Sequence, residues 1–184
     1  MREQGQCQID VLRGRRDPED GARTERGYNL FAVKFRLRSY TPQDFEIIHE
    51  VDQRCFEKEI AYSRAEMRAY LKLPGAECVI AESEPGKIAG FCLAAHEKGV
   101  GYLVTMDVLE KYRRQGVGGA LLEEMEKRLA ARGAQEMWLE TATDNEAAIA
   151  FWNKHRYRKQ GTQKNYYPNG RDAYTMRKKI ADSG

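Results

Sequence analysis

The sequence predicts a single mixed α/β domain, on the basis of three observations. The chain has 184 residues, which suits one domain, and 41% of them are hydrophobic, enough for a core. Short alternating or apolar segments, typical of strands, occur both before and after amphipathic segments, typical of helices. No internal repeat breaks the predicted order, which is β-α-α-β-β-β-α-β-α-β-β.

The domain is expected to occupy residues 29–184. Residues 1–28 contain the string RGRRDPEDGARTERG, which is charged, rich in glycine and nearly free of large apolar side chains. Such composition is typical of a flexible segment. We therefore interpret these residues as a charged N-terminal extension.

A strand and a helix open the domain. The strand is indicated by apolar residues that alternate with small or basic ones: Phe31, Val33, Phe35 and Leu37. Thr41 and Pro42 are typical of a helix N-cap and first helical position. The apolar face of this helix is expected to carry Phe45, Ile48, Val51 and Cys55.

A second helix and a hairpin follow. Ser63 and Glu66 have the spacing of a capping box and predict a helix that ends before Pro74. The apolar runs at 78–82 and 88–96 are separated by the turn sequence SEPGK, which predicts a β-hairpin.

The middle of the chain predicts strand, helix and strand. The strands are expected at 101–109 and 137–140. The helix between them spans about 118–132, with one apolar stripe opposite charged residues, and Gly133 closes it.

The last elements are a helix and two strands. Thr143 and Glu146 again have capping-box spacing and predict a helix that runs to about Lys154. Two closing strands are expected at 158–164 and 173–179, joined by a loop that contains the string YYPNG.

Composition argues against several classes of protein. The net charge of +3 is too small to indicate a nucleic-acid or membrane partner by itself. Cysteine and histidine show no metal-ligand spacing, and no segment resembles a secretion signal or a membrane span. We expect reduced thiols, no metal, no membrane contact and a cytoplasmic location.

The C-terminal third is basic. Residues 153–180 hold nine Lys or Arg and a single acidic residue, Asp172. This charge fits an anionic ligand or an acidic substrate, and it fits a solvated surface equally well.

A glycine-rich junction between the strand at 101–109 and the long helix is the strongest functional signal. Gly116, Gly118 and Gly119 would let backbone N–H groups approach an anion at a helix N-terminus. No GK[ST] string is present, and Leu121 stands where a GxGxxG motif needs glycine. The pattern that fits is [RQ]xxGx[GA], which begins at Arg113.

The segment YRRQGVGGALL resembles the acetyl-CoA loop of the GNAT acetyltransferase superfamily, and the similarity extends from about residue 33 to 180. The resemblance implies a mixed, mostly antiparallel sheet of six to seven strands flanked by four helices. It implies a strand bulge at 106–108, where the Val108 amide would polarise the thioester carbonyl. The implied cofactor contacts are Met106, Asp107, Val108, Arg113, Arg114, Gln115, Gly116, Val117, Gly118, Gly119 and Asn145.

Within the superfamily, the strings MWLE, TDNEAAIAFW and NYYPNGRDAYTM resemble N-terminal α-amine acetyltransferases, especially the ribosomal-protein-alanine (RimI-like) type. By this resemblance Glu140 is the general base that takes the proton of the amine. Tyr166 and Tyr167 would line the groove for a protein or peptide N-terminus. An ion-paired Glu140 and two surface tyrosines are the plainer alternatives.

The family's general acid is a tyrosine in the following helix, and this chain has Trp152 in its place. An indole N–H donates a hydrogen bond but does not release its proton at neutral pH. Two hypotheses follow. Either Trp152 packs against the pantetheine arm and solvent protonates the sulfur, or Tyr157 or a loop tyrosine such as Tyr166 supplies the proton.

Other functions stay open at this point. An acetyltransferase for a small amine would use the same cofactor loop. A weakly catalytic acetyl-CoA sensor or subunit is suggested by Trp152. A nucleic-acid-binding module is disfavoured because no aromatic–basic RNA-binding string occurs. We expect a monomer or a homodimer.

Overall fold

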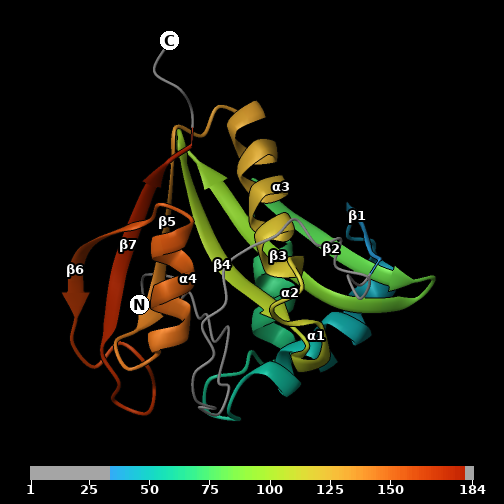
Figure 1. Cartoon of the computed structure of the whole chain (residues 1–184), viewed down its shortest axis with the longest axis horizontal. Coiled ribbons are helices and arrows are strands. Elements are labelled where there is room, and N and C mark those ends of the chain that lie inside the picture. Colours follow the sequence, from blue (N-terminus) through green and yellow to red (C-terminus); the bar gives the residue numbers. More distant parts are fainter. Residues whose placement is uncertain (1–33, 181–184) are drawn as a thin grey trace, which may run out of the picture.

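The structure, a computed structural model, describes residues 34–180. This part of the chain contains seven strands and four α-helices arranged in layers (Figure 1). Their bounds are β1 Arg36–Ser39, α1 Phe45–Cys55, α2 Arg64–Leu71, β2 Ala76–Glu84, β3 Lys87–Glu97, β4 Val100–Val108, α3 Val117–Ala131, β5 Glu136–Ala142, α4 Glu146–Lys154, β6 Arg158–Gln163 and β7 Ala173–Lys179.

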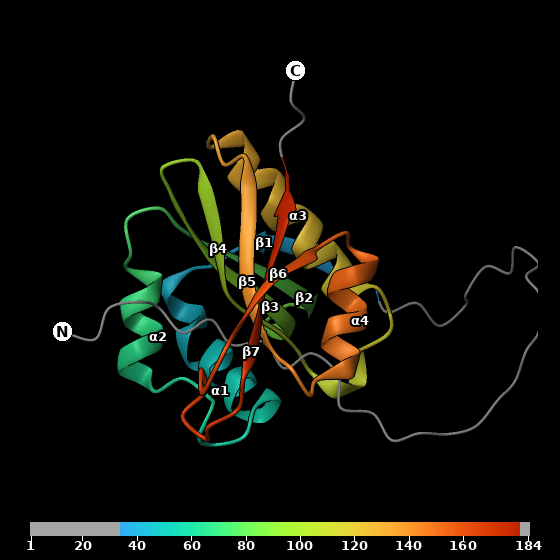
Figure 2. The same ribbon diagram turned by 90° about the vertical axis from the view of Figure 1, so that its left-hand side faces the viewer.

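The strands form one mixed sheet in the order β1-β2-β3-β4-β5-β7-β6. Only the β4–β5 pair is parallel, and the other neighbours are antiparallel. Helices α3 and α4 lie on one face of this sheet, and α1 and α2 lie on the other (Figures 1 and 2). The predicted fold class is confirmed.

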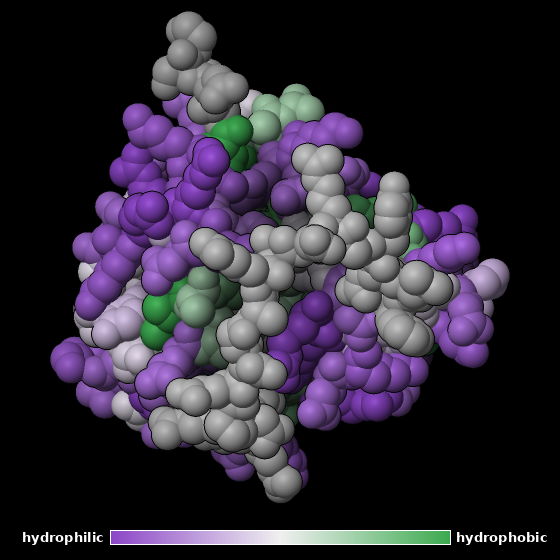
Figure 3. All heavy atoms as spheres, in the orientation of Figure 1, coloured by the Kyte–Doolittle hydropathy of each residue, from purple (hydrophilic) through white to green (hydrophobic). Residues whose placement is uncertain are grey.

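Each face of the sheet has its own core. Leu121, Met125 and Leu129 of α3 pack on the first face together with residues of β2 to β5. Ile48 and Val51 of α1 pack on the second face against β2 and β3. Both helices have the apolar spacing that the sequence showed, which is why they lie flat on the sheet. The space-filling view shows that the outer surface on the α3–α4 side is mostly hydrophilic, with a small hydrophobic area over α4 (Figure 3).

The two parallel strands stay paired for only three residues. Val100, Gly101 and Tyr102 of β4 pair with the first residues of β5, and the last of these pairs joins Tyr102 to Trp138. Beyond it β4 and β5 no longer form a ladder. The edge of each strand is therefore available to other groups from Leu103 and Leu139 onward.

Helix starts agree with the sequence at α2 and differ at α4. The Ser63 side chain accepts from the Glu66 N–H, and the Glu66 carboxylate accepts from the Ser63 N–H, as a capping box requires. At α4 the predicted Thr143 cap is wrong. The N-cap is Asn145, whose Oδ1 accepts from the Ala148 N–H at 3.0 Å. Thr143 and Asn145 both suit a cap.

Helix α4 ends without the glycine that its geometry favours. Arg156 has φ +69°, in the left-handed region. Its N–H bonds to Asn153 O, and the Tyr157 N–H bonds to Trp152 O. These two bonds define a Schellman motif, and the Trp152–Tyr157 ring contact supplies its apolar part.

Several expected bounds need adjustment. A 3₁₀ turn at Pro42–Asp44 follows Thr41, and α1 begins only at Phe45. The N-terminal extension, with Phe31 and Val33 of the first expected strand, lies outside the described residues. Within residues 34–180 no helix has the length and apolar character needed to cross a membrane.

Candidate active site

The site lies where β4 and β5 separate, and it connects the two faces of the sheet. Side chains alternate along a strand, so neighbours on β5 point to opposite faces. Leu139 points into the core under α3, whereas Glu140 lines a cavity on the α1–α2 face. Leu103 and Val104 of β4, which also follow the last β4–β5 pair, line the same cavity. A group bound on the α3 side can thus reach Glu140 through the sheet.

The turn before α3 is shaped to receive an anion. Gly116 is the N-cap of α3, has φ +86°, and offers no side chain to cap the helix. The first N–H groups of a helix lack partners within the helix. Apart from the adjoining residues, no atom of residues 34–180 lies within 4 Å of the point where a Gly116 Cβ would be, so this side of the turn is open. These features suit the phosphate-binding role expected for 115–119.

Two side chains hold the end of β4. Arg113 Nε donates to Val108 O at 2.8 Å, and Cys55 Sγ lies 3.6 Å from the same oxygen. Burial is the main reason that the pKa of the Cys55 thiol rises to about 12, so the thiol keeps its proton and can donate. Arg113 therefore fixes the strand to the turn.

The Val108 amide faces the separated edge. The Leu109 N–H bonds to Ala89 O of β3 at 3.0 Å. Successive N–H groups of a strand point to opposite edges, so the Val108 N–H points away from β3, toward the β5 side. This direction agrees with the role expected for this amide.

The strand irregularity is not where the resemblance placed it. Leu93 pairs with Thr105 and Ala94 pairs with Leu103, which leaves Val104 as an extra residue on β4. The expected bulge at 106–108 is therefore wrong, and the irregularity lies at Val104, two residues before that range. Met106 and Asp107 are buried within the regular ladder. Thr105 donates to the Asp107 carboxylate at 2.8 Å.

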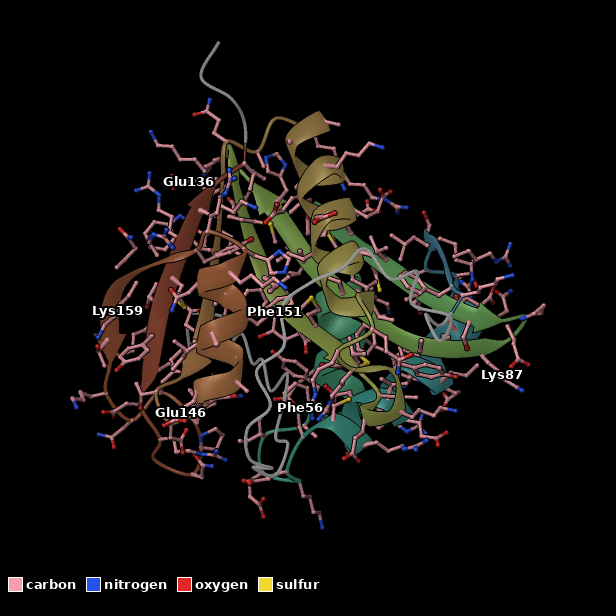
Figure 4. The ribbon with its side chains drawn as sticks, in the orientation of Figure 1. Phe56, Lys87, Glu136, Glu146, Phe151 and Lys159 are labelled. Carbon is pink, nitrogen blue, oxygen red and sulfur yellow. The ribbon has the colours of Figure 1, made fainter. Side chains whose placement is uncertain are left out.

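Helix α4 meets the start of α3 through an aromatic ring. Phe151 lies on the side of α4 that faces α3 (Figure 4). A Cβ added to Gly118 would lie 3.6 Å from the Phe151 ring and 3.8 Å from Val108 Cγ2. Gly118 thus lies at ordinary contact distance from both α4 and β4. Asn145, the expected cofactor contact on α4, uses its side-chain oxygen as the helix cap.

Neither aromatic residue proposed near the sulfur is exposed. Trp152 is 0% exposed, and its Nε1 has no hydrogen-bond partner among the described residues. The Tyr157 hydroxyl donates to Glu126 Oε1 at 3.0 Å and lies 3.6 Å from Met137 Sδ. Met137 pairs with Gly101, seven residues before Val108, a separation of roughly 20 Å along a strand. This position argues against Tyr157 as the group that protonates the sulfur.

Glu140 has the environment of a base that works near neutral pH. Its carboxylate accepts a hydrogen bond from Gln163 Nε2 at 3.3 Å. Burial raises the pKa of Glu140 from 4.5 to about 7, and the Gln163 hydrogen bond offsets this only in part. No ion pair of Glu140 is found in residues 34–180. The ion-paired alternative considered from the sequence does not apply.

The cavity around Glu140 has a volume of about 920 Å³. Tyr166 lines it, as expected for an acceptor contact. Tyr167 does not line it, because its ring is only 3% exposed and packs against Ala142 and Ala173. Tyr167 instead packs against Tyr166: the two rings meet edge to face, with their centroids 5.0 Å apart.

Sequence reasoning missed several residues of the site. Gln163 holds Glu140 and also donates to Thr175 at 2.9 Å. Tyr102 and Leu73 line the cavity, although they lie far apart in the sequence. The only sequence signal for these residues was the alternation of the strand at 101–109, which places Tyr102 on its outer face. Within residues 34–180, no three His, Cys, Asp or Glu side chains gather as metal ligands.

Comparison with protein families matches residues 45–157 to the Acetyltransferase (GNAT) family. An N-alpha-acetyltransferase from Sulfolobus acidocaldarius is 27% identical over 157 residues, which cover 78% of this chain and 92% of that protein. The ribosomal protein bS18-alanine N-acetyltransferase of Escherichia coli is 32% identical over 114 residues, which cover 56% of this chain and 76% of that protein.

Solved structures give the same picture. The ribosomal-protein-S18-alanine N-acetyltransferase from Escherichia coli superposes with a TM-score of 0.73 at 27% identity, covering 82% of this chain and 97% of that one. Ard1 from Thermoplasma volcanium superposes with a TM-score of 0.74 at 23% identity, covering 80% and 99%. The second similarity is one of fold alone.

Proposed function

Since the chain belongs to the Acetyltransferase (GNAT) family, it is an acetyltransferase, and we propose that it moves the acetyl group of acetyl-CoA to the N-terminal α-amine of a polypeptide. The observation that carries this proposal is the position of Glu140, which lies in a large cavity beyond the last β4–β5 pair and has a pKa of about 7. Relatives named for N-terminal or ribosomal-protein-alanine acetylation support the same acceptor class.

The residues of the α3 turn fit acetyl-CoA. Left-handed Gly116 exposes the N–H groups of Val117 to Gly119, and the space beside it is open. An anionic diphosphate is stabilised by such a helix N-terminus. Arg114 and Gln115 complete the turn, and the free β4 edge at Met106 to Val108 would pair with the amide groups of the pantetheine arm. Asn145 and Phe151 would bound this arm on the α4 side.

Glu140 is suited to an α-amine. Such an amine has a pKa of about 7.7–8.0, against about 10.4 for lysine, a difference of roughly 3.4 kcal/mol in the cost of deprotonation. Once the amine is neutral, a carboxylate with a pKa of about 7 can take the proton that the nitrogen releases as it bonds to the carbonyl carbon. A lysine acceptor would need a stronger base or a lowered amine pKa.

Bound acetyl-CoA supplies the carbonyl carbon that the amine attacks. The Val108 N–H, held in place by the bonds to Val108 O from Arg113 and Cys55, donates to the carbonyl oxygen as it becomes negative. We assign no protein acid to the leaving sulfur. A thiol with a pKa of about 8.5 can leave as the thiolate and take its proton from solvent. Trp152 then has a packing role.

The decisive experiment incubates the protein with acetyl-CoA and either a library of short peptides or a panel of free small amines. Mass spectrometry locates the acetyl group, and thiol release gives the rate. We expect acetylation at peptide α-amines, lost in Glu140→Gln. Glu136→Gln is the matched control, because Glu136 is on the same strand and face but is ion-paired to Arg177. Modification of small amines with no product on any peptide would refute the proposal.

A further inference from the structure

Two large apolar side chains stand out because they are exposed in the described part of the chain. Leu73 is 42% exposed and Tyr102 is 51% exposed. Leu73 comes from the turn between α2 and β2, and Tyr102 comes from β4. Single exposed apolar residues are common on protein surfaces, but both of these line the cavity that contains Glu140. Their exposure therefore belongs to one site.

The spacing between Tyr102 and Glu140 corresponds to a short stretch of extended chain. Tyr102 pairs with Trp138, and Glu140 is two residues further along β5. Two strand residues span about 7 Å, and neighbouring strands lie about 4.8 Å apart, so the two backbones are about 8 Å apart. An extended polypeptide covers about 3.3–3.6 Å per residue. A chain whose amine lies at Glu140 would place its second or third residue beside Tyr102.

The side of Glu140 beyond the end of β5 is bordered by two loops that contact each other. Arg171, in the loop between β6 and β7, forms an ion pair with Glu57 in the loop between α1 and α2 at 2.7 Å. Tyr167 is buried against Ala142, the last residue of β5. These contacts tie the loops together beyond the end of β5. Away from these loops, the lining of the cavity extends from Glu140 over Tyr102 to the turn after α2.

Charge does not set the selectivity of the far end of the cavity. Glu97 and Lys98 line it there and form an ion pair with each other at 3.5 Å. Their charges cancel, so neither sign of acceptor charge is favoured. Apart from His96 and the tyrosine hydroxyls, the other side chains that line the cavity there are apolar. A volume of about 920 Å³ is also far larger than a simple amine needs.

Building on the proposed function, we propose that the acceptor polypeptide runs from Glu140 over Tyr102 toward the turn after α2. An apolar side chain at its second or third residue is held between Leu73 and Tyr102. The substrate class is thus a polypeptide N-terminus followed closely by a large apolar residue. We assign the surface formed by Leu73 and Tyr102 to the acceptor because both residues line the same cavity as Glu140.

The first test uses the unmodified protein and a set of hexapeptides with free α-amines. Positions two and three are each varied among Gly, Leu, Phe, Asp and Lys, and kcat/KM is measured by thiol release. Because a large apolar side chain would be buried, kcat/KM for a peptide with Leu or Phe at one of these positions should exceed that for the Gly peptide by about tenfold or more. Equal kcat/KM values across the set would overturn this inference and leave the proposed function standing. No acetylation of any peptide would overturn both.

The second test uses Leu73→Ser and Tyr102→Ser. In each variant the ratio of kcat/KM between the apolar peptide and the Gly peptide should fall to within about threefold of one. Lys72→Ser is the matched control, because Lys72 is exposed on the same turn and does not line the cavity. Calorimetry with acetyl-CoA checks that each variant is folded and binds the cofactor. An apolar preference that survives in both variants would overturn the assignment to Leu73 and Tyr102.

Discussion

Replacing Glu140 with glutamine should abolish most activity. At pH 8, where Glu140 is ionised, the same substitution should also stabilise the fold. Both effects come from one property of this side chain, its partial burial without a cation. Gln keeps the size of the side chain and can still accept the hydrogen bond from Gln163. Loss of a general base typically lowers kcat by about 10²- to 10⁴-fold.

The pH dependence of the rate identifies the base. With a pKa of about 7, roughly one tenth of Glu140 is ionised at pH 6 and about nine tenths at pH 8. The amine, with a pKa of about 7.7–8.0, must also lose a proton. Below pH 7 the logarithm of kcat/KM should therefore rise with a slope near two for the native chain and near one for Glu140→Gln. A slope of two in the variant would refute the reasoning.

Ionisation of Glu140 raises the rate but lowers the stability of the fold. The pKa of Glu140 is 4.5 in the unfolded chain and about 7 in the fold, so the fold holds the proton more tightly. The free energy of unfolding then falls as pH rises from about 4.5 to 7, by at most about 3 kcal/mol. Denaturation by urea at pH 5 and pH 8 should show Glu140→Gln gaining relative stability at pH 8. Asp52, whose pKa burial also raises to about 7, contributes equally to both proteins and cancels in this difference.

Three further changes test other parts of the site. Gly116→Ala should cost about 1 kcal/mol of stability, because residue 116 has a left-handed backbone conformation. It should also weaken acetyl-CoA binding at least tenfold in calorimetry, because the methyl group would enter the open side of the turn. An unchanged Kd would place the diphosphate elsewhere. Arg156→Gly should raise Tm by about 2–3 °C in a thermal scan by relieving a left-handed arginine, and a lower Tm would contradict the Schellman assignment. Trp152→Tyr should lower stability by about 1–3 kcal/mol without raising kcat, because the ring is fully buried; a tenfold gain in kcat would show that the native chain lacks a needed acid.

Local patterns predicted the elements well. The capping box at Ser63 and the apolar stripe of α3 each depend on residues within a few positions of one another, and the structure contains both. The position of Glu140 on the face opposite Leu139 also follows from strand alternation. Such features need no knowledge of distant parts of the chain.

Features that depend on tertiary contacts could not be predicted. Two capping residues compete at the start of α4, and spacing alone favoured Thr143 over Asn145. The bulge at Val104 depends on how β4 registers with β3, a separate segment. The buried positions of Trp152 and Tyr167 depend on neighbours that the sequence does not place beside them.

The short β4–β5 ladder divides the sheet into two subassemblies, β1 to β4 and β5 to β7. Three residue pairs are the only strand ladder that joins them within the described chain, so the packing of α3 and α4 carries much of the connection. Amide hydrogen exchange at this seam should be faster than in the centre of either subassembly. A ligand that bridges both strand edges takes the place of a missing strand. At a free concentration 100 times its Kd, such a ligand adds about 2.7 kcal/mol to the free energy of unfolding.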